Sequence, residues 1–257
     1  MSKLTAKQNI KAIVTAIKAE EQSLRARYPI LNQQNKIAMV ILLVSLCSLF
    51  GVATLYYLAV IPSWLCIILA AFITSISHEL EHDLIHKQYF SNRPFIHNFM
   101  MLTVWLMRPN TVNPWYRRKI HLHHHKVSGT SQDLEERLVG NGIKSPLLRA
   151  LVITDGLLGL LINTKRFKKE ISGFKFLRVF NAGFPIATAY FAILYGVIAY
   201  YAVQFLQPFT LPDWGAELLA MAEFLMVVLI VPNIIRSSSL NCVCSCLLYT
   251  SDAADDL

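Results

Sequence analysis

The chain has 257 residues, of which 54% are hydrophobic, with a mean hydropathy of +0.44 and a formal net charge of +8. That composition is too apolar for an ordinary soluble domain with a solvated surface. Lysine and arginine are absent from two strongly apolar zones, 37–86 and 179–235. Because the gaps in charge coincide with the apolar runs, the basic excess indicates cytoplasmic loops of a membrane protein rather than a nucleic-acid surface. We expect membrane lipid as a partner and no nucleic acid.

The N-terminal segment, residues 1–36, is predicted to lie in the cytosol or at the membrane interface. Apolar residues recur between lysines at Leu4, Ile10, Ile13, Val14 and Ile17. This pattern is typical of an amphipathic helix that lies on a membrane surface.

Four apolar runs are candidates for membrane spans. Residues 38–60 are continuously apolar and, at about 1.5 Å per residue, long enough to cross the hydrocarbon core. The next run, 65–76, reaches the far side only if its helix continues into the sequence SHELEHD. Two more runs cover 182–206 and 216–232. We therefore predict an all-α integral membrane fold, with four transmembrane helices arranged as two hairpins.

The long central region, 83–178, is basic and mostly polar. Its two shorter apolar stretches, 95–107 and 147–162, are too short to span and are predicted to lie at the interface. The distribution of lysine and arginine places this region and both chain ends on the cytoplasmic face. A bacterial inner membrane is the favoured location.

The end of the chain has an unusual origin. Cys242, Cys244 and Cys246 form a C-x-C-x-C pattern that suggests soft-metal binding. However, the ten letters from Cys246 to Asp255, CLLYTSDAAD, match one reading frame of the transposon-end adapter used to build sequencing libraries. Residues 246–257 are therefore predicted not to be native, and residues 37–245 to be a partial membrane domain. The C-x-C-x-C pattern is not interpreted as a metal site.

All eight histidines lie between residues 78 and 125. The first cluster comprises His78, His82 and His86, and residues four apart share one face of a helix, where two imidazoles can hold one metal ion. Ionisable groups at the end of a membrane helix favour a functional role. The segment also matches H-E-x-x-H, the zinc peptidase pattern, with Glu79 as general base and Asp155 as a candidate further ligand.

The second cluster comprises His121, His123, His124 and His125. Together the clusters supply at least five imidazoles, more than one tetrahedral zinc ion uses. A nitrogen-rich set of this size suits two first-row ions, and iron fits oxygen chemistry. A non-enzymatic metal transporter or sensor is a further alternative. It would need ionisable residues within the spans, yet 182–206 carries no charge.

The paired histidine boxes resemble those of the membrane fatty acid desaturases, and HEL-x-H is also similar to the first box of membrane alkane hydroxylases. The resemblance covers roughly residues 37–236. It implies a non-haem di-iron (Fe) centre with five ligands, His86 and His123 being further candidates. The five are His78, His82, His121, His124 and His125. The D-x-E segment, Asp133 to Glu135, implies carboxylates that orient ligand histidines.

The resemblance also implies a lipid acyl substrate and electrons from a separate carrier, a ferredoxin or a cytochrome b-type protein. Desaturation is the favoured reaction, with hydroxylation by the same centre as the alternative. Basic residues near the second cluster are candidates for contact with an anionic head group or an acidic carrier; they are Arg117, Arg118, Lys119 and Lys126. The family's third histidine box is missing, so the 257-residue chain is expected to lack turnover.

Overall fold

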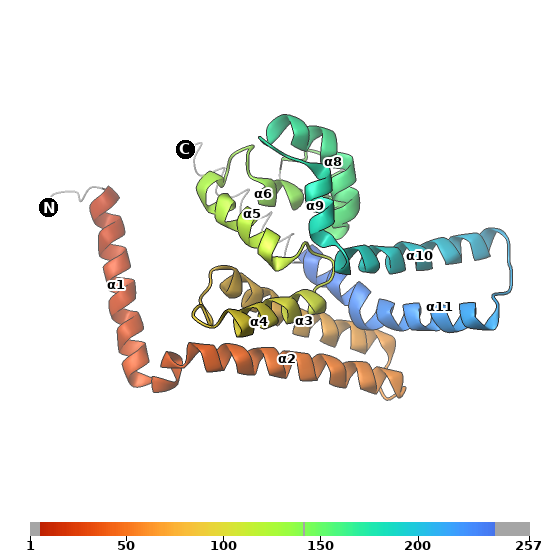
Figure 1. Cartoon of the computed structure of the whole chain (residues 1–257), viewed down its shortest axis with the longest axis horizontal. Helices are drawn as coiled ribbons and strands as arrows, with labels where there is room; N and C mark the ends of the chain where they lie inside the picture. The colour runs from red at the N-terminus through yellow and green to blue at the C-terminus, as the bar shows by residue number, and fades with distance from the viewer. Residues whose placement is uncertain (1–5, 141, 240–257) are drawn as a thin grey trace. The chain divides into compact units, whose positions relative to one another are not determined.

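The computed structural model describes residues 6–140 and 142–239, and these contain helices and no strand (Figure 1). The predicted adapter-derived tail and the C-x-C-x-C pattern lie outside the described residues. The helices are α1 (Ala6–Arg27), η1 (Pro29–Asn32), α2 (Gln34–Tyr57), α3 (Ser63–Ile85), α4 (Pro94–Met107), α5 (Pro114–Val127), α6 (Leu134–Leu138), α7 (Pro146–Thr154), α8 (Gly156–Glu170), α9 (Phe176–Gly183), α10 (Ile186–Leu206), α11 (Asp213–Leu225) and η2 (Met226–Ile230).

Four helical segments are long and apolar enough to span a membrane, which confirms the predicted fold class. They are Gln34–Tyr57, Ser63–Ile85, Ile186–Leu206 and Asp213–Ser239. As expected, α3 continues from its apolar run into the first histidine cluster. The pairing of the spans into hairpins and the side of the membrane on which their ends lie stay predictions.

The last span is longer than the predicted run 216–232 and contains a π-helical turn, η2, followed by helical residues 231–239. A π turn holds one residue more than a regular α turn. Hydrophobic patterning does not reveal such an insertion, because the residues in it are all apolar: Met226, Val227, Val228, Leu229 and Ile230.

The chain divides into two compact units, residues 1–41 and 42–257. In the first, α1 forms where the amphipathic pattern predicts it. Its Arg25 donates to Glu21 at 2.9 Å and to the Leu31 carbonyl at 2.6 Å, which ties the end of α1 to η1. The apolar side chains of Ile13 and Ile17 are exposed, as expected of a helix whose apolar face has no protein partner.

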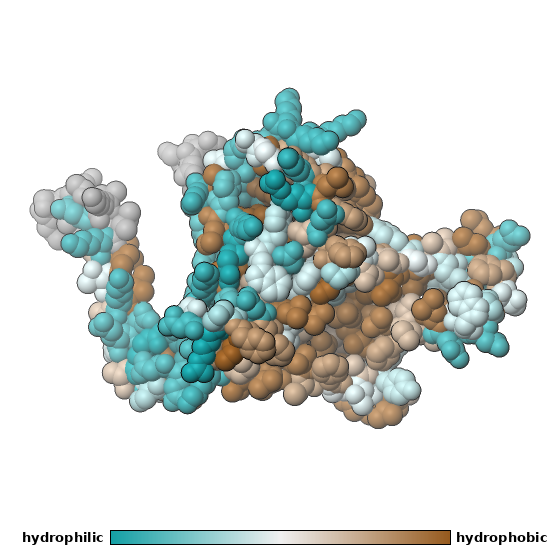
Figure 2. All heavy atoms as spheres, in the orientation of Figure 1, coloured by the Kyte–Doolittle hydropathy of each residue, from teal (hydrophilic) through white to brown (hydrophobic). Residues whose placement is uncertain are grey.

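Within the second unit, apolar residues gather over α2, α4 and the adjoining parts of α10 and α11, whereas hydrophilic residues gather over α5 and α8 (Figure 2). Many apolar side chains of the spans are exposed, including Phe50, Phe72 and Leu206. These are the surfaces that lipid tails would cover. Cys66 of α3 is buried, whereas Cys47 of α2 is exposed.

Local signals set the helix ends in the central region. Asn113 accepts a hydrogen bond from the Tyr116 amide at 2.8 Å and caps α5, whose first residue is Pro114. Asp155 accepts from the amides of Leu157 and Leu158, both at 2.9 Å, and caps α8. The apolar stretch 147–162 is therefore two helices, α7 and α8, rather than one segment.

The polar end of the last span is attached to the segment between α4 and α5. Asn233 is fully buried and donates to the Met107 carbonyl at 3.1 Å, at the end of α4. Asn110 donates to the Ser237 hydroxyl at 2.6 Å and accepts from Arg236 at 3.0 Å. These contacts join residues more than 120 positions apart and hold the end of the fourth span against the segment that follows α4.

A matched pair of cysteines tests the predicted topology. In a variant without native cysteines, Ser172→Cys lies at an exposed position of the central region and Thr210→Cys at an exposed position of the connector between α10 and α11. Positive charge on the cytoplasmic side predicts that an impermeant maleimide labels only Thr210→Cys in intact cells, and labels both after permeabilisation. Labelling of Ser172→Cys from outside would contradict the predicted orientation.

Candidate metal centre

Two helices bring four histidine rings together. His82 and His86 lie on the last turn of α3 and just after it, and His121 and His125 lie one turn apart on α5. The Nε2 atoms of His86, His121 and His125 are 3.0, 3.1 and 3.3 Å from one another. The ring of His82 lies 4.8 Å from that of His86 and 4.9 Å from that of His121. Ring nitrogens of two different helices thus converge on one point.

Hydrogen bonds on the far side of the rings determine which nitrogen carries the proton. The Nδ1 of His121 lies 2.8 Å from Glu135 Oε2. An ionised carboxylate can only accept, so Nδ1 is the protonated nitrogen and Nε2 presents a lone pair. That lone pair faces the Nε2 atoms of His86 and His125. Lone pairs directed at one another repel unless a proton or a cation lies between them.

The spacing of the nitrogens fits a shared metal ion. Nitrogen ligands at about 2.1 Å from a first-row ion lie roughly 3.0–3.4 Å from each other, which is the range seen for the three Nε2 atoms. His82, His86 and His121 also offer ligand atoms that all lie within 4.8 Å of one another. The donors are imidazole nitrogens, the ligand type that suits iron, zinc and copper.

A second group of potential ligands lies beside the first. Ligand atoms of His124, Asp133 and Glu136 lie within 4.8 Å of one another. The Nδ1 of His124 lies 2.5 Å from Asp133 Oδ2, and Asp133 is fully buried. As in His121, this contact places the ring proton on Nδ1 and leaves Nε2 with its lone pair. The contacts of Asp133 and Glu135 with ring nitrogens have the form expected of the D-x-E segment, while their role at a metal stays a prediction.

The ionisation of nearby groups is consistent with this proton arrangement. Burial raises the pKa of Glu135, but the hydrogen bond from His121 and the charge of Arg117 outweigh it, so the pKa lies below its usual value. Glu135 therefore remains an acceptor. Burial, together with the neighbouring histidines, lowers the pKa of His86 and favours its neutral form.

The structure does not join every predicted ligand to these two groups. His78 lies one helical turn before His82, but it belongs to neither group, and its buried Nδ1 has no hydrogen-bond partner among the described residues. His123 is exposed. His86, a further candidate in the sequence, lies at the centre of the cluster instead. All three histidines of the first cluster share one face of α3, so their position along the helix axis decides which of them meet the histidines of α5.

The peptidase arrangement is not present among the described residues. Glu79 is exposed, and His78 does not meet His82 in a candidate metal group. Asp155, the candidate third ligand, caps α8 and accepts a hydrogen bond from the Tyr195 hydroxyl. Its carboxylate is therefore engaged in a different part of the fold.

Arg118 attaches α5 to the end of α3. Its guanidinium donates to the carbonyls of Leu84 at 2.7 Å and Ile85 at 2.8 Å, at the end of the helix where carbonyls run out of intrahelical partners. It also lies 2.6 Å from Nε2 of His97, which must accept because a guanidinium only donates. His97 then donates from Nδ1 to the Tyr89 carbonyl at 2.9 Å, so it is a structural residue.

A buried ion cluster lies directly behind the histidines and was not identified from the sequence. Glu81 is 1% exposed and accepts from Arg108 and, at 2.6 Å, from Arg117. Arg117 also lies 3.9 Å from Glu135. The cluster therefore connects α3, the segment after α4, α5 and the Glu135 carboxylate that orients His121. A carboxylate within the last turns of a membrane span is the sequence signal that could have revealed it.

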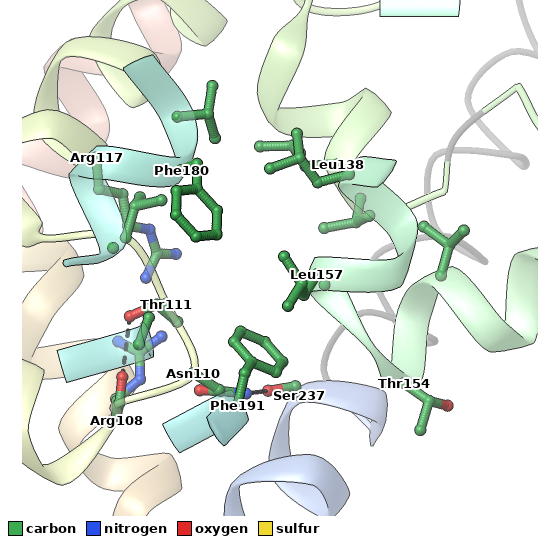
Figure 3. A pocket seen from close by; sticks show the side chains of 18 of the residues that line it. Arg108, Asn110, Thr111, Arg117, Leu138, Thr154, Leu157, Phe180, Phe191 and Ser237 are labelled. Atoms are coloured by element: carbon green, nitrogen blue, oxygen red, sulfur yellow. Dashed lines mark hydrogen bonds between the residues drawn. The ribbon is translucent and has the colours of Figure 1, made fainter. Parts of the chain in front are cut away.

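A cavity of about 480 Å³ adjoins the cluster and is lined by His78, Arg117 and Glu135 on this side. In Figure 3, Arg108, Arg117 and Thr111 form one wall, opposite Leu138 and Leu157 on the other, with Phe180 and Phe191 also on its lining. Its volume falls within the range of small-molecule sites. One wall is cationic and the rest is mainly apolar.

Comparison with known proteins gave one match. The family model described as fatty acid desaturase matches residues 58–241, well over half of the chain, including both histidine clusters. No curated protein matches the chain, and no solved structure matches it.

The two glutamates of HELEH are predicted to differ in their effect on stability. Glu81→Gln leaves two arginines without their buried carboxylate and should lower the free energy of unfolding by about 3–5 kcal/mol. Glu79→Gln changes an exposed side chain on the same helix and should have an effect within about 0.5 kcal/mol. Denaturant unfolding in mixed micelles measures both. Equal stabilities would show that the Glu81 cluster does not hold α3 and α5 together.

Proposed function

The chain belongs to the fatty acid desaturase family, and on that premise we propose that it is an oxygen-dependent di-iron oxidoreductase that desaturates a lipid acyl chain. The observation that carries the proposal is the convergence of histidine Nε2 atoms from α3 and α5 beside a largely apolar cavity. The family indicates an oxidoreductase, and the four spans indicate an integral membrane protein.

The residues present fit a metal ion. His82, His86, His121 and His125 would hold one iron, and His124 would contribute its Nε2 to a second, while Asp133 holds its Nδ1. When bound, iron in a nitrogen-rich site supplies the oxygen activation that attack on an unactivated C–H bond requires. His78 is a further candidate, because its buried Nδ1 has no partner among the described residues.

Carboxylates of α6 and its cap set the proton positions in the centre. Glu135 and Asp133 keep the ring protons of His121 and His124 on Nδ1, so that both Nε2 atoms remain free to bind metal. Asp133 is itself fixed, since its other oxygen caps α6 through the amides of Glu135 and Glu136, at 3.0 and 3.2 Å. The rings are thus oriented before a metal ion binds.

The cavity supplies a largely apolar site for an acyl chain. Its apolar wall comes from α6, α8, α9 and α10, with Leu138, Leu157, Phe180 and Phe191 among the lining residues. Glu135 lines the cavity and contacts His121, so a chain in the cavity lies beside the residues that orient the metal ligands. The side chains of this wall bind and position the chain through apolar contact.

An external carrier would deliver the electrons, and the proposed docking face is cytoplasmic. Lys119 and Lys126 on α5 are exposed and suit an acidic partner such as a ferredoxin or a cytochrome b-type protein. Arg117 and Arg118 do not belong to this face, because their guanidinium groups are directed at Glu81 and at the end of α3.

Metal content tests the proposal directly. The purified chain should bind iron, and His121→Ala should remove most of it, because it deletes the nitrogen that contacts both His86 and His125. His123→Ala, in the same histidine run but exposed, should retain the wild-type iron content. Zinc without iron, or equal loss in both variants, would contradict the proposal.

Asp133→Asn tests proton placement separately from folding. Asparagine keeps the cap of α6, but its amide turns a donor toward Nδ1 of His124, which moves the ring proton to Nε2. Affinity for Fe²⁺, titrated against a chromophoric chelator, should fall about 10–100-fold with unchanged helicity. Asp155→Asn, at a cap remote from the histidines, is the matched control and should bind iron like the wild type. Equal affinity in the two variants would remove the assigned role of Asp133.

A further inference from the structure

Three arginines from separate segments line the same cavity. Arg108 follows α4, Arg117 lies on α5, and Arg236 lies at the end of the last span. Arg108 is 1% exposed and Arg236 3% exposed, so two of the three guanidinium groups are removed from bulk water. Burial of arginine to this degree is costly unless a negative charge is close by.

Among the residues that the structure describes, the carboxylates close to these arginines do not balance their charges. Glu81 pairs with Arg108 and Arg117, and Glu135 lies 3.9 Å from Arg117. Three positive groups and two negative ones leave one positive charge. Arg236 has no acidic partner in the described part of the chain, where its hydrogen bonds go to the neutral oxygens of Asn233, Asn110 and Ser237 at 3.0–3.1 Å.

Donors remain unused at the same place. The buried Nε of Arg108 has no hydrogen-bond partner among the described residues. A guanidinium has five N–H groups on three nitrogens, and the contacts of Arg236 involve only Nε and one terminal nitrogen. Planar, paired N–H donors are the groups that bind a carboxylate most effectively.

We propose that the cationic wall of the cavity binds the carboxylate of a free fatty acid, whose acyl chain lies against the apolar wall. This inference rests on the proposed function, because it takes the occupant to be an acyl chain, and it adds the head group. The site recognises a negatively charged oxygen group joined to an apolar chain. The uncompensated charge is a single one, which favours the carboxylate, with one negative charge, over a phosphate, with nearly two.

The choice of variant follows from the contacts. Removing Arg108 or Arg117 would leave Glu81 short of a partner and would damage the fold. Removing Arg236 leaves only neutral groups without a donor. Arg236→Gln therefore removes the charge, Arg236→Lys retains the charge without the planar donors, and Arg93→Gln removes an exposed arginine outside the cavity as the control.

The experiment measures binding of radiolabelled palmitate to the whole chain in phosphatidylcholine nanodiscs, with empty nanodiscs subtracted. Competition with unlabelled palmitate, palmitoyl lysophosphatidate and hexadecanol separates carboxylate, phosphate and neutral head groups on the same chain length. In the wild type and in Arg93→Gln, palmitate should compete with a dissociation constant at least about 10-fold lower than that of hexadecanol. A tenfold ratio corresponds to about 1.4 kcal/mol of binding free energy. Arg236→Gln should lose that preference, and Arg236→Lys should recover part of it.

The competition series on the wild type decides the question even if Arg236→Gln does not fold. Equal competition by palmitate and hexadecanol would overturn the inference and leave the acyl cavity standing. Stronger competition by the lysophosphatidate would overturn the carboxylate assignment in favour of phosphate. Iron content is measured in the same preparations. Absence of iron would count against the proposed function. If the protein binds iron and Arg236→Gln still prefers palmitate, the result would count against the arginine site alone.

Discussion

The site depends on one carboxylate at the end of a membrane helix. Glu81 accepts from Arg108 and Arg117, and so joins α3 to the segment after α4 and to α5. The interior of the protein solvates charge poorly, so Glu81, Arg108 and Arg117 depend on one another. If one of them moved into water, the buried charges that remained would lose their partner. The same ion pair sets the positions of the histidines. Arg117 lies one turn from His121 on α5, and Glu81 is adjacent to His82 on α3, so the pairing of Glu81 with Arg117 brings the two histidines together.

The polar contacts around this pair form a continuous connection toward the ligand histidines. Arg117 lies 3.9 Å from Glu135, and Glu135 contacts Nδ1 of His121 at 2.8 Å. The guanidinium thus helps to keep Glu135 ionised, which in turn keeps the His121 proton away from Nε2. Arg118 acts on the same interface by satisfying the carbonyls of Leu84 and Ile85. Orientation of the rings is therefore a property of the helix packing rather than of the histidines alone.

Hydropathy and four-residue spacing are local signals, and they were sufficient to predict the spans and the histidine clusters. The contact of the D-x-E carboxylates with the histidines was expected only from the family resemblance. The sequence did not distinguish His86 from His78. The two lie on the same helix face on either side of His82, and the height at which α5 docks decides between them. Nor did charge counting distinguish Lys119 and Lys126, which are exposed, from Arg117 and Arg118, which turn inward. That difference depends on acceptors distant in the sequence.

The π-helical turn at Met226–Ile230 links the register of the last span to the chemistry of the cavity. One extra residue advances every following position by about 100° around the helix axis. Asn233, Arg236 and Ser237 face Met107 and Asn110 only with that advance included. Loss of a single apolar residue from the turn would leave the span long enough to cross the bilayer and equally hydrophobic, yet rotate its polar end away from the cavity. The position of the polar end of this span therefore depends on the number of residues in the turn as well as on their type.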